Sequence, residues 1–141
     1  MTYLRTIRFS DTDAAGVVYF ATLLSICHEA YENALAEAGI NLKTFFSRTE
    51  IIVPIVHATI DFYHPLFCGD RLQIHLTPTQ LNEAEFEISY EMLNLSASDV
   101  CVAKAKTKHV CINSQLRQRT PLSSSIMQWL ESNPKNSTQL D

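Results

Sequence analysis

The sequence predicts an α+β fold in which an antiparallel sheet of five strands curls around one long helix. Apolar residues recur at steps of three and four from about residue 18 to residue 38, which is the period of one helix face. The residues expected on this face are Phe20, Leu23, Leu24, Cys27, Tyr31, Ala34, Leu35 and Ala38. Four segments with strand-like alternation then follow one another without a helix between them, and a fifth precedes the long helix. Strands in succession, rather than in alternation with helices, are typical of an α+β arrangement.

Each of the first elements follows from a local signal. The first strand is expected over residues 3–10, where apolar and charged side chains alternate loosely. Turn-forming residues at 11–16 end this strand and lead into the helix. Gly39 is expected to end the helix in the left-handed conformation that glycine adopts readily. A short helical turn is expected around Phe45 and Phe46.

The rest of the chain alternates with a period of two. β-Branched and aromatic residues over 51–64 indicate a strand, with Pro54 at an edge or a bulge. Gly69 is expected to turn this strand into the next one. Further strands are expected over 71–76, 85–92 and 100–112, and a short helix over 121–130. Because one helix cannot cover five strands fully, we expect sheet edges to pair in a dimer.

Composition and charge restrict the class of protein. The chain has 141 residues, of which 46% are hydrophobic and 18% charged, so we expect one domain over 1–132 and a polar tail over 133–141. The net charge of −4 argues against nucleic-acid binding, which needs clustered Lys and Arg. No apolar run approaches the ~18 residues of a membrane span. We therefore expect a cytoplasmic protein with reduced thiols and no membrane partner.

The sequence lacks the motifs of several common nucleotide-binding and metal-binding sites. The three glycines stand far apart, which excludes a G-x-G-x-x-G loop and a phosphate-binding P-loop. The four cysteines form no C-x-x-C pair. His57, Asp61 and His64 could suggest a metal site, but strand alternation puts His64 on the opposite face from the other two. We interpret them as polar surface or pocket lining and expect no metal and no cofactor.

The segment FSDTDAAGVVYF, residues 9–20, lies between the first strand and the start of the helix. The first N–H groups of a helix lack partners within it, so they could stabilise a carbonyl oxygen that gains negative charge. A carboxylate just before them could attack that carbonyl or direct water at it. The alternative is that Asp11 or Asp13 only caps the helix and that Gly16 only makes a turn.

The motif D-x-D-x-x-G-V-V-Y, followed by a long helix and then strands, resembles the 4-hydroxybenzoyl-CoA thioesterase family of hotdog-fold proteins. The resemblance runs from Thr6 to about Pro121 and matches the predicted order of elements. Within the family, the string DTDAAGVVYFATLLSICHEAYE is similar to cyanobacterial 1,4-dihydroxy-2-naphthoyl-CoA thioesterases of phylloquinone biosynthesis. The resemblance thus implies hydrolysis of an aromatic acyl-CoA to the free acid and CoA.

The resemblance also implies roles for individual residues. Asp13 matches the catalytic carboxylate of the family, which acts as nucleophile or as general base. The backbone N–H of Phe20 matches the donor that polarises the thioester carbonyl, and Gly16 matches the glycine of the loop. We assign Tyr19 and His64 to substrate binding, although His64 is also in a position typical of a turn histidine.

The phosphates of CoA need cations. In 4-hydroxybenzoyl-CoA thioesterase, basic residues near the third and fourth strands help to hold them, but the comparable stretch here, residues 82–85, is not basic. Arg119 matches a recurrent arginine of the family and is expected to meet a phosphate. Weaker candidates, which could equally be solvated surface residues, are Arg117, Lys104, Lys106 and Lys108.

Hotdog proteins generally bind substrate at a dimer interface, so the resemblance implies a homodimer or a homotetramer. On the helix, Glu29 could orient a water or a substrate hydroxyl, or could serve only the helix surface. His28 and Glu32 are expected to form a surface pair. Two alternative functions stay open: hydrolysis of other acyl-CoA or acyl-carrier thioesters, and a non-catalytic module that binds a ligand or partner.

Overall fold

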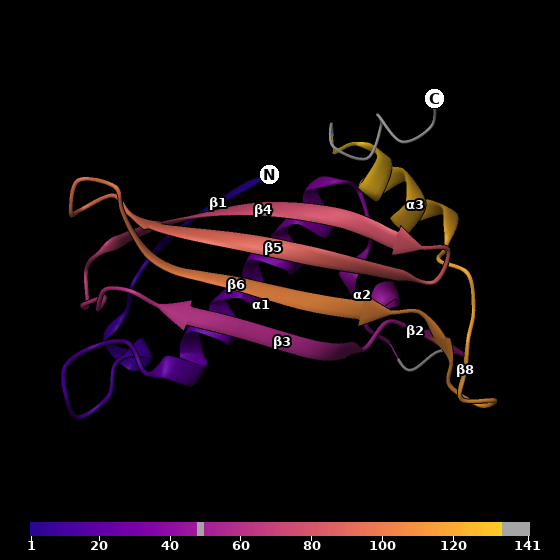
Figure 1. Ribbon diagram of the computed structural model, residues 1–141, viewed down its shortest axis with the longest axis horizontal. Coiled ribbons are helices and arrows are strands. Elements are labelled where there is room, and N and C mark those ends of the chain that lie inside the picture. Colours follow the sequence, from indigo (N-terminus) through magenta and orange to yellow (C-terminus); the bar gives the residue numbers. More distant parts are fainter. Residues whose placement is uncertain (48–49, 134–141) are drawn as a thin grey trace. The chain divides into compact units, whose positions relative to one another are not determined.

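The computed structural model describes residues 1–47 and 50–133 (Figure 1). Its main sheet has five strands in the order β1-β4-β5-β6-β3, and one long helix, α1, accompanies them. The α+β class and the five-stranded antiparallel sheet are therefore confirmed. The expected polar tail lies outside the described residues, except for Asn133.

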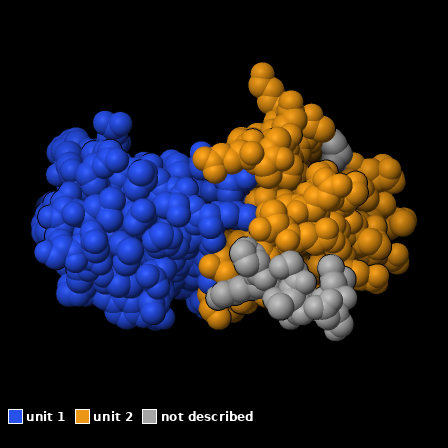
Figure 2. Space-filling model, turned by 90° about the horizontal axis from the view of Figure 1, so that it is seen from above, with its two compact units in different colours: residues 1–34, 59–76, 89–105 blue, residues 35–58, 77–88, 106–141 orange. Residues whose placement is uncertain are grey.

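The chain clusters into two compact units, coloured separately in Figure 2. The first unit comprises Met1–Ala34, Thr59–Leu76 and Ser89–Ala105. The second unit comprises Leu35–Ala58, Thr77–Ile88 and Lys106–Asp141. The helix α1 and strands β3, β4, β5 and β6 each contribute residues to both units.

The first strand is shorter than the sequence predicts. Strand β1, Thr2–Thr6, pairs antiparallel with β4, and Thr6 lies opposite Arg71 in the register. The predicted strand continued to residue 10, but Phe9–Asp11 form a 3-10 turn, η1, instead. The carboxylate of Asp11 accepts the backbone N–H of Arg8 at 2.7 Å, which bends the chain back on itself and ends the strand.

The long helix α1, Phe20–Glu37, agrees with the prediction to within two residues at each end. Its core-facing stripe differs in part. Ile26 and Ala30 are buried although the predicted face omitted them, whereas Phe20 belonged to that face and is 60% exposed. Buried stripe residues are spaced by three and four: Leu23, Ile26, Cys27, Ala30, Tyr31 and Ala34.

Cys27 anchors α1 to the sheet in the first unit. Its Sγ lies 3.9 Å from the Sδ of Met92 in β5, and both residues are fully buried. Burial raises the pKa of the Cys27 thiol to about 12, so the thiol stays protonated and packs as an apolar group. The four cysteines, all within the described residues, are free of disulfides.

The remaining long strands are β3, Ile55–Phe62; β4, Arg71–Asn82; β5, Glu85–Asn94; and β6, Val100–Val110. Strand β4 continues to Asn82, beyond the end that the sequence predicts at residue 76. The predicted alternation is confirmed in β6, where Ala103 and Ala105 are buried while Lys104 and Lys106 are exposed. Strand β3 differs, because all of its residues except the half-buried Ile60 are exposed. It is also an end strand of the sheet.

The predicted strand over 51–64 is divided into two. Strand β2, Ile51–Ile52, and β3 are separated at Pro54, which has no N–H to donate to a ladder. In the second unit, β2 forms a small antiparallel sheet with β7, Ile112–Asn113, and β8, Gln118–Arg119. Two-residue strands carry no periodic signal, which is why the sequence did not predict β8.

Two short helices complete the second unit. Helix α2, Leu42–Phe45, confirms the predicted helical turn. Helix α3, Ser124–Glu131, confirms the predicted terminal helix; it begins where the Ser123 hydroxyl accepts the Ile126 N–H at 3.3 Å. None of the helices in the described residues is both long enough and apolar enough to cross a membrane.

Candidate active site

The segment that contains the D-x-D motif folds as a narrow hairpin in the first unit. The Tyr19 N–H donates to the Asp11 carbonyl at 3.0 Å, and the Asp13 N–H donates to the Val17 carbonyl at 3.0 Å. Between these two bonds, Thr12 and Val18 form an antiparallel bridge. The hairpin therefore pairs residues 11–13, which end at Asp13, with residues 17–19, which lead into α1.

The tip of this hairpin requires glycine for its backbone conformation. The Gly16 N–H donates to the Asp13 carbonyl at 3.0 Å, which closes a four-residue turn. Gly16 has a φ of +81°, a conformation that other residues adopt at a cost. A Cβ at this position would meet no atom within 4 Å, so crowding by this chain is not the reason for the glycine.

The two acidic residues of the motif have different environments. Asp11 is buried, and hydrogen bonds from Arg5 lower the pKa of its carboxyl despite the opposing effect of burial. Asp13 is exposed, and its Oδ1 accepts the Ala15 N–H at 2.9 Å. Within the described residues, the second oxygen of Asp13 accepts no hydrogen bond.

Neither carboxylate caps α1. Asp13 bonds to the N–H of Ala15, in the hairpin tip, and Asp11 bonds to Arg5 and to the N–H of Arg8. The alternative interpretation of these residues as helix caps is therefore wrong. Asp11 holds the hairpin in place, while Asp13 presents a carboxylate oxygen to solvent.

The first helical residue supplies the candidate backbone donor. Phe20 begins α1, where N–H groups have no partner within the helix and the dipole is positive. In the described part of the chain, the Phe20 N–H has no acceptor. The Phe20 ring contacts the Tyr19 ring edge-on, with centroids 4.8 Å apart.

A cavity of about 300 Å³ lies beside the start of α1 in the first unit. It contains two of the residues that the sequence singled out, Phe20 and His64. His64 is fixed there by its backbone, because its N–H donates to the Val102 carbonyl at 3.2 Å. The remaining lining is mostly apolar or aromatic: Val17, Val18, Leu23, Phe62, Tyr63, Pro65 and Leu66.

The aromatic part of this cavity was not identified from the sequence. Phe62 and Tyr63 are 47% and 52% exposed although both are large and largely apolar. The sequence predicted a strand over 51–64 from its β-branched and aromatic residues, but that pattern assigned neither residue to a cavity. An apolar, aromatic lining with one histidine suits a flat aromatic group better than a charged one.

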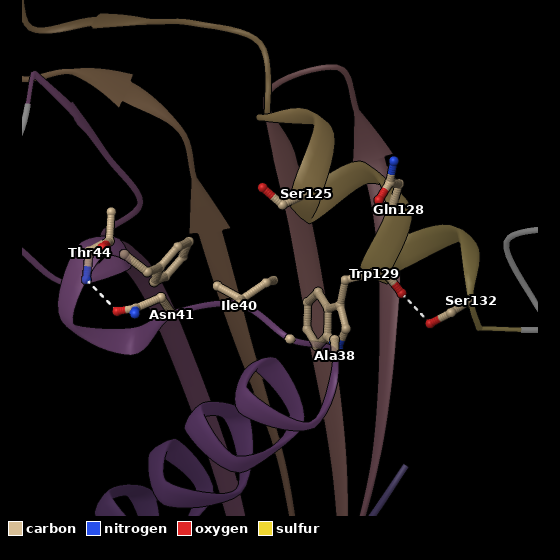
Figure 3. Close-up of a pocket in the computed structure, with 10 residues that line it drawn as sticks. Ala38, Ile40, Asn41, Thr44, Ser125, Gln128, Trp129 and Ser132 are labelled. Carbon is tan, nitrogen blue, oxygen red and sulfur yellow. Dashed lines mark hydrogen bonds between the residues drawn. The ribbon is translucent and has the colours of Figure 1, made fainter.

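A larger cavity, of about 640 Å³, lies in the second unit (Figure 3). Residues that directly follow α1, and residues in α2 and in α3, line it, including Asn41, Thr44, Gln128 and Trp129. Its lining contains hydroxyl and amide groups but no titratable side chain. Since it offers neither an acid nor a base, we do not place thioester chemistry there.

Arg119 lies in the second unit, on β8. Its Nη1 is 2.7 Å from Oε1 of the buried Glu85, and 66% of the arginine side chain is exposed. Lys108 and Lys106 are within 3.4 Å of Glu85 and 3.8 Å of Glu87 on the neighbouring strand, respectively. Lys106 and Lys108 are therefore better interpreted as surface residues in cross-strand ion pairs than as phosphate ligands.

The remaining polar candidates have clear partners. His28 Nδ1 lies 3.4 Å from Glu32 Oε1 with both side chains near 40% exposed, which confirms the predicted surface pair. Glu29 binds Arg5 and Tyr3, so it has a role beyond the helix surface. Within residues 1–47 and 50–133, no three His, Cys, Asp or Glu side chains are grouped so that they could hold a metal ion.

Residues 7–130 match the model of the thioesterase-like superfamily, and the chain belongs to that family. A 1,4-dihydroxy-2-naphthoyl-CoA hydrolase of Crocosphaera subtropica is 71% identical over 94% of this chain and 97% of its own. The enzyme of the same name from Rippkaea orientalis is 62% identical, over 92% and 94% of the two chains. A crystal structure of a 1,4-dihydroxy-2-naphthoyl-CoA thioesterase from Synechocystis superposes with a TM-score of 0.87 at 41% identity, covering 92% and 93%. The hotdog fold is thereby confirmed.

Proposed function

We propose that this protein hydrolyses 1,4-dihydroxy-2-naphthoyl-CoA to 1,4-dihydroxy-2-naphthoate and CoA, a step of phylloquinone biosynthesis. The observation that carries the proposal is the hairpin that joins the exposed carboxylate of Asp13 to the start of α1. Relatives up to 71% identical are 1,4-dihydroxy-2-naphthoyl-CoA hydrolases, and their similarity spans nearly the whole chain. The chain is therefore a thioester hydrolase, and its substrate is a CoA thioester.

Asp13 and the Phe20 N–H divide the chemistry between them. As a general base, the Asp13 carboxylate takes a proton from water while the water oxygen bonds to the thioester carbonyl carbon. The tetrahedral species then breaks its C–S bond, and the proton held by Asp13 passes to the departing CoA thiolate. As a nucleophile, the carboxylate forms an anhydride with the acyl group and releases CoA thiolate, and water then cleaves the anhydride. In both routes the carbonyl oxygen becomes negative, and the free N–H of Phe20 stabilises it.

The acyl group enters the cavity beside α1. Its lining by Phe20, Phe62 and Tyr63 favours a flat aromatic group over a flexible chain. His64 at the same cavity can bond a ring hydroxyl, and Tyr19 extends the aromatic surface through its contact with Phe20. Gly16 has the positive φ that the turn following Asp13 requires.

Arg119 is our candidate for the phosphates of CoA. Most of its side chain is exposed, which leaves N–H donors for a phosphate oxygen. The pairing with Glu85 offsets part of the arginine charge, and the exposed part of the guanidinium remains the candidate contact for a phosphate.

We propose that residues 1–132 act as one functional domain and that two or four copies assemble. Strand β3 supports the assembly, because it ends the sheet and exposes Val56 at 57% and Phe62 at 47%. An apolar end strand with exposed faces is a template for pairing with another chain. We further propose a cytoplasmic location, which suits four cysteines without a disulfide.

Turnover of a panel of thioesters tests the substrate. Purified protein is assayed for CoA release from 1,4-dihydroxy-2-naphthoyl-CoA, benzoyl-CoA and palmitoyl-CoA under the same conditions. We expect kcat/KM to be at least ~10-fold higher for the naphthoyl thioester than for benzoyl-CoA, because its second ring buries more apolar area. Hydrolysis of palmitoyl-CoA alone contradicts the aromatic assignment, and absence of CoA release from every thioester contradicts the enzyme assignment.

A further inference from the structure

One guanidinium joins three elements of the first unit. Arg5 in β1 donates from Nη1 and Nη2 to the two oxygens of Asp11 in η1, at 2.6 and 3.1 Å. The same side chain donates from Nε to Glu29 in α1 at 2.7 Å, and from Nη2 to its other oxygen at 3.4 Å. Tyr3 also donates its hydroxyl to Glu29, at 3.2 Å. We call Arg5, Asp11 and Glu29 the Arg5 clamp.

The clamp has the features of a rigid attachment. The side chains of Arg5 and Asp11 are 17% and 8% exposed, so salt and water screen their interaction less than that of a surface pair. A planar guanidinium that grips a carboxylate with two parallel bonds fixes both distance and orientation, which a lysine cannot do. Both oxygens of Glu29 are engaged, so this residue is not a free base for a substrate hydroxyl.

Asp11 connects Arg5 to the hairpin. Its side chain is held by Arg5, and its carbonyl accepts the Tyr19 N–H at 3.0 Å. Asp13 follows Asp11 by two residues, and Phe20 follows Tyr19 directly. The clamp therefore fixes both strands of the hairpin at its base, one leading to the carboxylate and the other to the backbone donor.

We propose that Arg5 is a positioning residue that sets the placement of Asp13 relative to the Phe20 N–H. Arg5 is not among the residues that line the cavity, so it acts through the hairpin rather than on substrate. The effect on rate rests on the proposed function, whereas the effect on the hairpin does not. A misplacement of reacting groups by about 1 Å can lower a rate by ~100-fold.

The test compares Arg5→Gln and Arg5→Lys with the matched control Arg71→Gln. Arg71 is an exposed arginine on β4 whose Nη1 donates to the Thr6 hydroxyl at 3.0 Å, outside the clamp. Each variant is assayed with 1,4-dihydroxy-2-naphthoyl-CoA well below its Tm, and the amide exchange of Tyr19 is measured by NMR. We expect Arg5→Gln to lower kcat by ~10- to 100-fold with KM within about 3-fold, Arg5→Lys to fall between it and wild type, and the control to match wild type.

Amide exchange separates the two claims. The Tyr19 N–H should exchange faster in Arg5→Gln than in Arg71→Gln, because it bonds to the Asp11 carbonyl. If the wild-type protein releases no CoA, the proposed function fails, and this comparison alone decides the clamp. Equal exchange in the two variants overturns the proposal.

A milder variant covers the case in which Arg5→Gln does not fold. Glu29→Gln removes the charge of the half-exposed arm of the clamp and keeps its size. We expect it to lower kcat by about 3- to 10-fold with KM unchanged. If folded Arg5 and Glu29 variants have lower Tm values but the kcat of the control, the clamp is only structural and the proposal is wrong.

Discussion

Two carboxylates separated by one residue have opposite relations to solvent. Asp11 is 6% exposed and its carboxylate is paired with the Arg5 guanidinium inside the protein. Asp13 is exposed and uses one oxygen for the Ala15 N–H, which leaves the other oxygen for water or for substrate. Environment rather than residue type therefore decides which acid of the motif is available to react and which one holds the loop.

The ion pair of Asp11 predicts a pH-dependent stability. The hydrogen bond from Arg5 is the largest influence on Asp11 and lowers the pKa of its carboxyl in the folded state. A lowered folded pKa stabilises the fold above the unfolded value, about 3.9, and this stabilisation is lost as the pH falls through the folded value. Urea unfolding of wild type and Asp11→Asn should therefore show a gap in unfolding free energy at pH 7 that narrows below about pH 4.

The matched control for this experiment is Asp99→Asn, in an exposed turn. This variant should track wild type at every pH. A gap between wild type and Asp11→Asn that keeps the same size from pH 7 to pH 3 would mean that the charge of Asp11 does not stabilise the fold.

At the scale of single residues, the sequence identified the candidate catalytic residues but not the residues that hold them in place. Asp13, Gly16 and Phe20 stand in one short motif, so a local pattern was enough to select them. The Arg5 clamp joins residues from three elements, and its geometry depends on how β1 and α1 pack. No local spacing carries that information, and for this reason Arg5 was missed.

At the scale of elements, the hairpin is the feature that links the candidate carboxylate, Asp13, to the candidate backbone donor, Phe20. It connects the end of η1 to the start of α1 through three successive backbone pairings. Because Gly16 closes its tip in a left-handed conformation, the hairpin has one turn geometry rather than several. The helix α1 ends in the same conformation at Gly39, with a φ of +83°.

These two glycines make a matched pair of tests. Each has a positive φ near +80° and would place a Cβ with no atom within 4 Å, so an alanine at either position suffers backbone strain alone. We expect Gly16→Ala and Gly39→Ala each to reduce the unfolding free energy by about 1–2 kcal/mol. Only Gly16→Ala should also lower kcat, by about 10-fold, because only this turn carries Asp13. Equal kcat in the two variants would contradict the role of the hairpin.

Long periodic elements were predicted well and short ones were not. The period of α1 and the alternation of β4, β5 and β6 arise from burial of one face, which leaves a mark in the sequence. The early end of β1 arises from a side-chain bond of Asp11, and the division of the strand over 51–64 from one proline. A boundary that depends on one residue leaves no periodic signal, so it cannot be predicted from the alternation of apolar and polar residues.

At the scale of the whole molecule, the two end strands of the sheet differ in what they expose. Strand β3 is exposed along almost its entire length, including Ile55 and Val56. Strand β1, at the other end, alternates between exposed and half-buried residues. We propose that copies of this chain pair through β3.

Substitutions on the two end strands test this inference. Val56→Lys in β3 replaces a residue that is 57% exposed, and Leu4→Lys in β1 replaces one that is 51% exposed. A charge buried between copies is costly, so Val56→Lys should shift the mass measured by sedimentation toward the monomer while Leu4→Lys leaves it unchanged. A monomeric wild type, or equal masses for the two variants, would contradict pairing through β3.

The central claim is that the Asp13 carboxylate drives the hydrolysis of 1,4-dihydroxy-2-naphthoyl-CoA. The most direct measurement is kcat for CoA release from that thioester by wild type, Asp13→Asn and the exposed-turn control Asp99→Asn. The Asn variant keeps the shape of the side chain and its bond to Ala15 but loses the charge. We predict a kcat lowered by at least ~100-fold for Asp13→Asn, with a Tm close to wild type and an unchanged control. Near-normal turnover by a folded Asp13→Asn protein would contradict the account.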